Sequence, residues 1–158
     1  MKVLLDEFII DRAAGGLEEQ LSVISLIKGI RMKCDVTVFT PKLIAKYFKK
    51  IKKYEKRFRC QPKALKSFAT LLQDSAKAKI IDQPLHVQLS QNFKEDEELV
   101  CAAIACGAEK MLITTDKDLI TKLYEGSMAT QHRIEAVQPE EAMEKRGYTD
   151  LLEQNSTF

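Results

Sequence analysis

The sequence predicts an α/β fold, in which a three-layer α/β/α sandwich surrounds a central, mostly parallel sheet of about five strands. Along the chain, short apolar runs alternate with longer stretches whose apolar residues recur at helical spacing. No internal repeat, low-complexity segment or linker interrupts this alternation. Strands that alternate with helices are typical of a parallel sheet whose two faces are covered by helices.

Composition limits the class of protein. The chain has 158 residues, of which 45% are hydrophobic and 30% charged, so we expect one domain over residues 1–158. Its apolar runs are shorter than the ~20 residues that a membrane span requires, and "MKVLLDEFII" is too short and acidic for a signal peptide. Without a CxxC pair, the four cysteines are expected to be buried, reduced thiols of a cytoplasmic protein without a membrane partner.

The first half of the chain contains two expected strands and two expected helices. The run "KVLLDEF" (2–8) predicts the first strand, and "LEEQLSVISLIKGI" (17–30) has the periodicity of an amphipathic helix. The β-branched residues of "DVTVFT" (35–40) predict the second strand. Thr40 and Pro41 then start a strongly basic helix, because a hydroxyl cap followed by proline favours a helix N-terminus.

The second half continues the alternation. Its expected elements are a helix over 62–78, a short strand or extended piece over 79–82, an alanine-rich helix from 96 that ends at Gly107, a buried strand over 110–114, a helix over 116–124, a strand over 132–137 and a helix over 139–147. Proline at the start of the first and last of these helices supports their placement.

Aspartates follow two of the expected strands. Asp6 ends "KVLL" and Asp116 ends "KMLIT", so both lie at the carboxyl edge of a parallel sheet, where ligand sites occur. The helix that precedes "KMLIT" runs antiparallel to that strand and returns Asp96 to the same edge. The acidic neighbours of Asp96 are Glu95, Glu97 and Glu98.

Two interpretations of these aspartates stay open. Asp96 and Asp116 could each cap the helix that follows, with support from the helix dipole. Asp6 caps no obvious helix, which favours the other interpretation, a carboxylate cluster. Such a cluster repels itself unless a hard divalent cation, Mg²⁺ or Mn²⁺, binds to it.

A basic run lies between Lys42 and Lys66, with eleven Lys or Arg and one acid, Glu55. A charge run on a helix is commonly a solvated face. This one begins in the helix that leaves the carboxyl edge, so it also fits a surface that contacts a nucleic-acid backbone. The expected contacts are Lys46, Lys49, Lys50 and Lys53.

The motifs "KVLLD", the "TP" helix start, "DEELVCAAIACGA" and "LITTDKDLI" together resemble a PIN domain. The likeness is greatest to the branch of ribonuclease toxins from toxin–antitoxin pairs, and it covers the chain from Met1 to about Glu144. The resemblance implies an α/β/α sandwich that hydrolyses RNA phosphodiester bonds with Mg²⁺ or Mn²⁺. It also implies RNA and a cognate antitoxin protein as partners, and a homodimer.

The resemblance carries the catalytic, metal-binding acids of the family onto Asp6, Asp96 and Asp116, with Asp118 as an outer metal ligand. The chain departs from the family at two places. Glu7 and Phe8 follow the first aspartate, where the family has a small polar residue. The family's second acid falls at Lys46, which predicts weak Mg²⁺ binding and slow or absent cleavage.

Three other functions make different demands on the sequence. A PIN-like module that binds RNA or protein without cleaving would keep the basic run and lose metal-dependent activity. A phospho-receiver domain needs a phospho-accepting aspartate at the end of a central strand, and "VFTPK" has none. A Rossmann enzyme needs GxGxxG after the first strand, and "DRAAGGLEEQ" lacks it.

Overall fold

The computed structural model describes residues 1–84, 89, 93–107 and 109–149. The strands are β1 (Lys2–Leu5), β2 (Val36–Phe39), β3 (Ala78–Ile80), β4 (Lys110–Ile113) and β5 (Ile134–Val137). The helices are α1 (Phe8–Ala13), α2 (Leu17–Met32), α3 (Pro41–Glu55), α4 (Lys63–Gln73), α5 (Glu97–Ala105), α6 (Lys117–Glu125), α7 (Met128–Gln131) and α8 (Pro139–Lys145), with a short 3₁₀ helix η1 (Lys94–Asp96) before α5.

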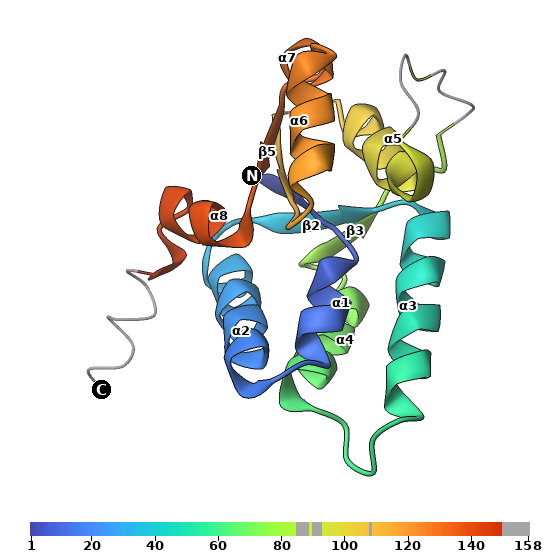
Figure 1. Ribbon diagram of the computed structural model, residues 1–158, viewed down its shortest axis with the longest axis vertical. Helices are drawn as coiled ribbons and strands as arrows, with labels where there is room; N and C mark the ends of the chain where they lie inside the picture. Colours follow the sequence, from blue (N-terminus) through green and yellow to red (C-terminus); the bar gives the residue numbers. More distant parts are fainter. Residues whose placement is uncertain (85–88, 90–92, 108, 150–158) are drawn as a thin grey trace.

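The five strands form one sheet in the order β3-β2-β1-β4-β5, and every pair of neighbours is parallel. Helices α1 to α4 lie on one side of this sheet, and α5 and α6 lie on the other (Figure 1). The expected α/β/α sandwich around a mostly parallel sheet of about five strands is therefore confirmed, with a sheet that is wholly parallel.

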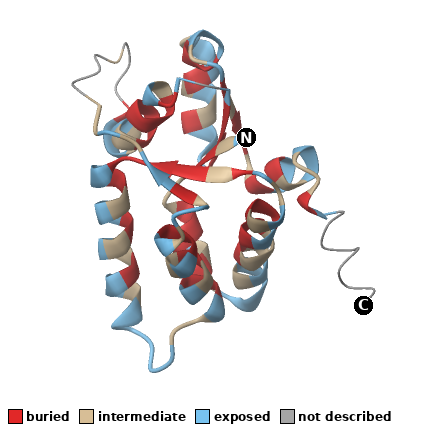
Figure 2. Cartoon of the chain, turned by 180° about the vertical axis from the view of Figure 1, so that it is seen from behind, coloured by how far each residue is buried: buried red, intermediate tan, exposed pale blue. Residues whose placement is uncertain are grey.

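The core lies on both faces of the two central strands. The side chains of Leu4 and Leu112 are fully buried, and Val3 and Met111 are at most 1% exposed. Figure 2 shows the buried positions along the strands and on the helix faces that cover them. Central strands covered on both sides read as continuous apolar runs, which is the pattern of "KVLL" and "KMLI".

The strand order reverses between β1 and β4, because β2 and β3 follow on one side of β1 while β4 and β5 lie on the other. The register pairs Leu5 with Ile113, and the N–H of Asp6 donates to the carbonyl of Ile113 at 3.1 Å. Both strands therefore end side by side at the position where open α/β sheets form their ligand crevice.

Three short helical segments were missed. Helix α1 begins at Phe8, where no helix was expected, but its N-cap residue is Glu7, so Asp6 does not cap it. Its six residues, "FIIDRA", are too short and too apolar at the start to show helical periodicity. Segments η1 and α7 have three and four residues, lengths at which sequence periodicity carries little information.

Two further expectations need correction. The helix expected over 62–78 ends at Gln73, because Asp74 forms a turn in which its carboxylate accepts the N–H of Ala76 at 3.0 Å. The four cysteines are free, but Cys34 and Cys60 are exposed, so only the other two are buried. Among the described helices, none is both long and apolar enough to cross a membrane.

Candidate active site

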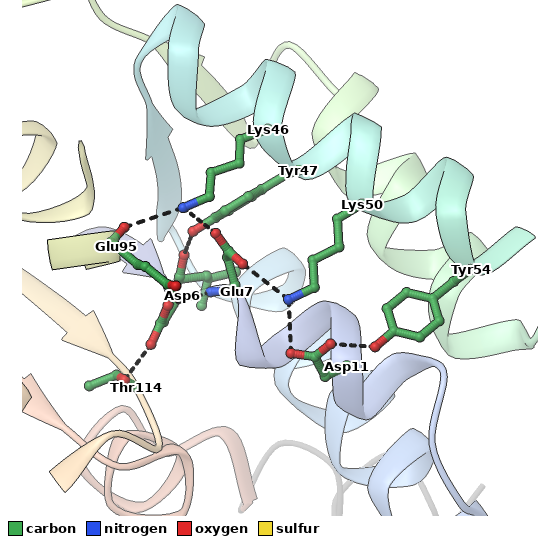
Figure 3. Close-up of polar contacts among 10 residues, drawn as sticks. Asp6, Glu7, Asp11, Lys46, Tyr47, Lys50, Tyr54, Glu95 and Thr114 are labelled. Carbon is green, nitrogen blue, oxygen red and sulfur yellow. Dashed lines mark hydrogen bonds and ion pairs between the residues drawn. The ribbon is translucent and has the colours of Figure 1, made fainter. Parts of the chain in front are cut away.

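Asp6 is held in place by the end of the neighbouring strand. Its Oδ2 accepts a hydrogen bond from the hydroxyl of Thr114 at 2.6 Å, and its Oδ1 accepts the main-chain N–H of Glu7 at 2.6 Å (Figure 3). The hydroxyl oxygen of the fully buried Thr114 also accepts the N–H of Asp116 at 3.0 Å. Thr114 thus joins the two aspartates that terminate β1 and β4.

Asp116 is the N-cap residue of α6, as one of the two interpretations of the sequence expects. Its Oδ1 caps α6 by accepting the N–H groups of Asp118 at 2.9 Å and Leu119 at 3.1 Å. The residue is exposed at the carboxyl edge, and its charge acts on Asp6. Asp118 is exposed in the first turn of α6, where its N–H is part of this cap.

Asp96 comes to the same edge at the junction of η1 and α5. Burial raises the pKa of Asp96, and the charges of Asp6 and Asp116 raise it further, to about 6. Burial also raises the pKa of Asp6 and outweighs the opposing hydrogen bonds of Thr114 and Glu7, while the charges of Glu7 and Asp116 add smaller increases. The structure therefore brings the three aspartates close enough for the charges of Asp6 and Asp116 to oppose the ionisation of Asp96.

The donor chemistry of this edge fits a hydrated divalent cation. Mg²⁺ and Mn²⁺ prefer oxygen ligands, and Mg²⁺ is usually held by one or two carboxylates while it keeps several waters. Within the described part of the chain, no three Asp, Glu, His or Cys side chains form a ready-made coordination group. The mutual repulsion of the aspartates is the property that a bound cation would relieve.

Lys46 lies at the same edge of the sheet as the three aspartates. Its ammonium pairs with the carboxylate of Glu7 and donates to the carbonyl of Glu95 at 3.3 Å (Figure 3). Its charge partly offsets the rise in the pKa of Asp96. Thr40 caps α3 by accepting the N–H of Leu43, so the helix begins at Pro41 as expected. With this start, Lys46 lies at the acidic edge.

A basic cavity of about 400 Å³ continues from this edge along α3. Its lining residues are Glu7, Lys46, Lys49, Lys50, Lys53, Tyr54 and Arg57. The four lysines recur every three or four residues, so they share one face of α3. All four lysines expected to contact nucleic acid line this cavity, which we call the basic groove.

Four residues that make contacts in the site were not predicted from the sequence to do so: Thr114, Glu7, Tyr47 and Asp11. The fully buried Tyr47 hydroxyl donates to the carbonyl of Leu5, which fixes α3 against the end of β1. Burial, then the charges of Asp6, Glu7 and Asp96, raise the pKa of Tyr47 well above its ordinary value. A polar Thr114 at the end of an apolar strand was a signal in the sequence, whereas the Asp11 contacts depend on the unexpected α1.

No protein-family model, curated protein or solved structure matches this chain. The site therefore has to be interpreted from its own geometry and charges.

Proposed function

We propose that this chain binds RNA in the basic groove and hydrolyses it with Mg²⁺ or Mn²⁺ at the carboxylate edge of Asp6, Asp96 and Asp116. One observation carries the proposal: the cavity lined by five cations shares Glu7 and Lys46 with the edge where three aspartates repel one another. A polyanion that follows the groove reaches the place where a divalent cation would be most strongly attracted.

The residues have separate roles in this proposal. Asp6 and Asp116 hold the cation, and Thr114 keeps their carboxylates oriented through its two hydrogen bonds. Asp96 adds negative charge from the start of α5. A bound divalent cation supplies Lewis-acid polarisation of a phosphoryl oxygen and lowers the pKa of a bound water.

Lys46 reduces the activity that this site can reach. Its ammonium beside Glu7 and Glu95 places a positive charge where the PIN family has its second acid. A cation close to the aspartates weakens their attraction for a metal ion. We therefore propose slow, Mn²⁺-favoured cleavage.

A second candidate function is an RNA-binding module without hydrolytic activity. The position of Lys46 favours it, because a fixed ammonium can neutralise part of the acidic edge in place of a metal ion. The antitoxin and the homodimer implied by the resemblance stay predictions.

Cleavage of a labelled single-stranded RNA, with Mn²⁺ or with chelator, tests the proposal. We expect slow Mn²⁺-dependent cleavage by the wild type and none by Asp116→Asn, which retains the cap acceptor but loses the charge. The variant, prepared in the same way, controls for contaminating nucleases. RNA binding without metal-dependent cleavage would favour the second candidate, and equal cleavage by both proteins would contradict the proposal.

A further inference from the structure

Glu7 lies between two lysines of the basic groove. Its Oε1 pairs with the ammonium of Lys46, and its Oε2 accepts a hydrogen bond from Lys50 at 3.0 Å (Figure 3). Burial would raise the pKa of Glu7, but these two lysines hold it below its ordinary value. Among the described residues that line the cavity, Glu7 is the one acid.

The bridge formed by Glu7 has the chemistry of a phosphate contact. A phosphodiester is, like a carboxylate, a singly charged anion whose free oxygens accept hydrogen bonds from lysine. Lys46 and Lys50 are one helical turn apart on α3, so a single small anion can contact both. The carboxylate of Glu7 makes this double contact already.

We infer that Glu7 occupies the place of an RNA phosphate between Lys46 and Lys50, and that RNA binds in the groove by displacing it. The inference rests on the proposed function, because it takes RNA as the ligand. Glu7 is then an intramolecular competitor that selects for polyanions. A strand that also contacts Lys49, Lys53 and Arg57 can displace it, whereas a single free phosphate has no such additional contacts.

The exposure of the three side chains makes this exchange feasible. Glu7 is 26% exposed, Lys46 41% and Lys50 27%, and ion pairs between partly exposed groups contribute little net free energy. Lys50 also keeps a second acidic partner, Asp11, at 3.0 Å. Displacement of Glu7 therefore leaves neither lysine buried without a partner.

RNA affinity without metal tests the inference. The binding of a labelled single-stranded oligoribonucleotide is measured by fluorescence anisotropy in chelator for the wild type, Glu7→Gln and Asp11→Asn. Asp11→Asn is the matched control, since it also removes one negative charge. Asp11 contacts Lys50 as Glu7 does, but it lies outside the cavity lining. We expect Glu7→Gln to tighten binding about fivefold and Asp11→Asn to change it less than about twofold.

Two further measurements isolate the mechanism. In a Lys46→Met/Lys50→Met background, Glu7→Gln should no longer tighten binding, because the carboxylate has no lysine left to occupy. Inorganic phosphate should compete with RNA for Glu7→Gln at lower concentrations than for the wild type. Equal effects of Glu7→Gln and Asp11→Asn on RNA affinity would show that only the net charge matters, and would overturn the inference. Weaker RNA binding by Glu7→Gln would also overturn it.

The failure of this inference can be distinguished from the failure of the proposed function. If Lys49→Gln and Lys53→Gln weaken RNA binding but Glu7→Gln does not tighten it, the groove binds RNA and only the role of Glu7 is wrong. If the lysine variants leave RNA binding unchanged, the groove is not the RNA site and both proposals fail. Glu7→Asp, whose shorter side chain spans the lysines less well, should bind RNA with intermediate affinity and provides a second, conservative variant.

Discussion

The ammonium of Lys46 donates a hydrogen bond at 3.3 Å to the main-chain carbonyl of Glu95, the residue before Asp96. This contact joins α3 to η1, directly before α5, across the carboxyl edge of the sheet (Figure 3). It also fixes a positive charge near Asp96, whose pKa is raised by burial and by the charges of Asp6 and Asp116. In the proposed function, the balance between this cation and a metal ion determines whether the site is active.

Replacement of Lys46 by Glu should increase Mn²⁺ affinity. The substitution exchanges a repulsive group for an attractive one near Asp96, and we expect an affinity gain of about tenfold. Isothermal titration calorimetry measures the change. Lys49→Glu is the control, because it makes the same charge change on an exposed turn of α3, and it should alter affinity about twofold at most. Equal gains from both variants would show that Lys46 has no special position.

Replacement of Asp96 by Asn should stabilise the metal-free protein at pH 7. Burial and the neighbouring aspartates raise the pKa of Asp96 from 3.8 to about 6, so at neutral pH the folded state holds an unfavourable charge. After allowance for its partial exposure, we expect about 1 kcal/mol in the free energy of unfolding by urea.

The pH dependence of that gain has a definite sign. Below about pH 4 the carboxyl of Asp96 is protonated in the folded and unfolded states, and the variant has no advantage. The advantage grows as the pH rises towards about 6, because only the unfolded state ionises freely in this range. A stabilisation that is constant from pH 4 to pH 7 would contradict the electrostatic coupling of the aspartates.

The salt dependence of RNA binding should report the basic groove. On single strands, the slope of log affinity against log salt changes by about 0.7 for each phosphate contact. Lys49→Gln/Lys53→Gln should therefore flatten the slope by about 0.7 to 1.4. Lys28→Gln, an exposed position on α2, is the control and should leave the slope unchanged. An unchanged slope in the double variant would show that Lys49 and Lys53 lie on a solvated helix face that RNA does not contact.

The opposite edge of the sheet contains a structural ion cluster. The carboxylate of Asp35 is fully buried, and it accepts hydrogen bonds from Nε of Arg146 at 3.0 Å, from the hydroxyl of Tyr148 at 2.6 Å and from the Met1 ammonium at 3.0 Å. Burial alone would raise the pKa of Asp35, but these donors lower it to about 2. The cluster attaches the segment after α8 to the residue that precedes β2.

Replacement of Asp35 by Asn should lower the free energy of unfolding by about 3 kcal/mol at pH 7, because it removes a buried charge that is paired with the partly exposed guanidinium of Arg146. The wild type should lose this contribution as the pH falls from about 4 to about 2, since the folded-state pKa is the lower one. Asp74→Asn is the control, because its ion pair with Arg31 is partly exposed and should contribute about 1 kcal/mol or less. A similar loss in both variants would contradict a buried role for Asp35.

The sequence predicted the parts of the fold that have strong periodicity or clear signals at the ends of helices. The parallel sheet followed from alternating strands and helices, and the edge position of Asp6, Asp96 and Asp116 followed from that topology. Helix α1 was missed because "FIIDRA" has no room for a helical repeat. Since α1 places Asp11 opposite Lys50, part of the network around the groove was missed with it.

The contacts of the site were less predictable than its location. Spacing from Pro41 placed Lys46 near the aspartates, because a helix has a fixed rise and period. The two contacts of Glu7 depend on the distance between α1 and α3, which is set by packing of apolar side chains and not by local sequence. The bridge from Thr114 to Asp6 depends on strand order, which the sequence left undetermined.

The most direct test of the central claim is a crystal structure of the wild type soaked in Mn²⁺, with data collected for the anomalous signal of manganese. We predict an anomalous peak within ligand distance of Asp6 and Asp116, with the remaining ligands supplied by water, and a stronger peak in Lys46→Glu crystals. Asp116→Asn crystals should lack it. A well-ordered carboxylate edge without a peak at high Mn²⁺ concentration, or a peak only at some other surface, would contradict the claim that these aspartates form a metal site.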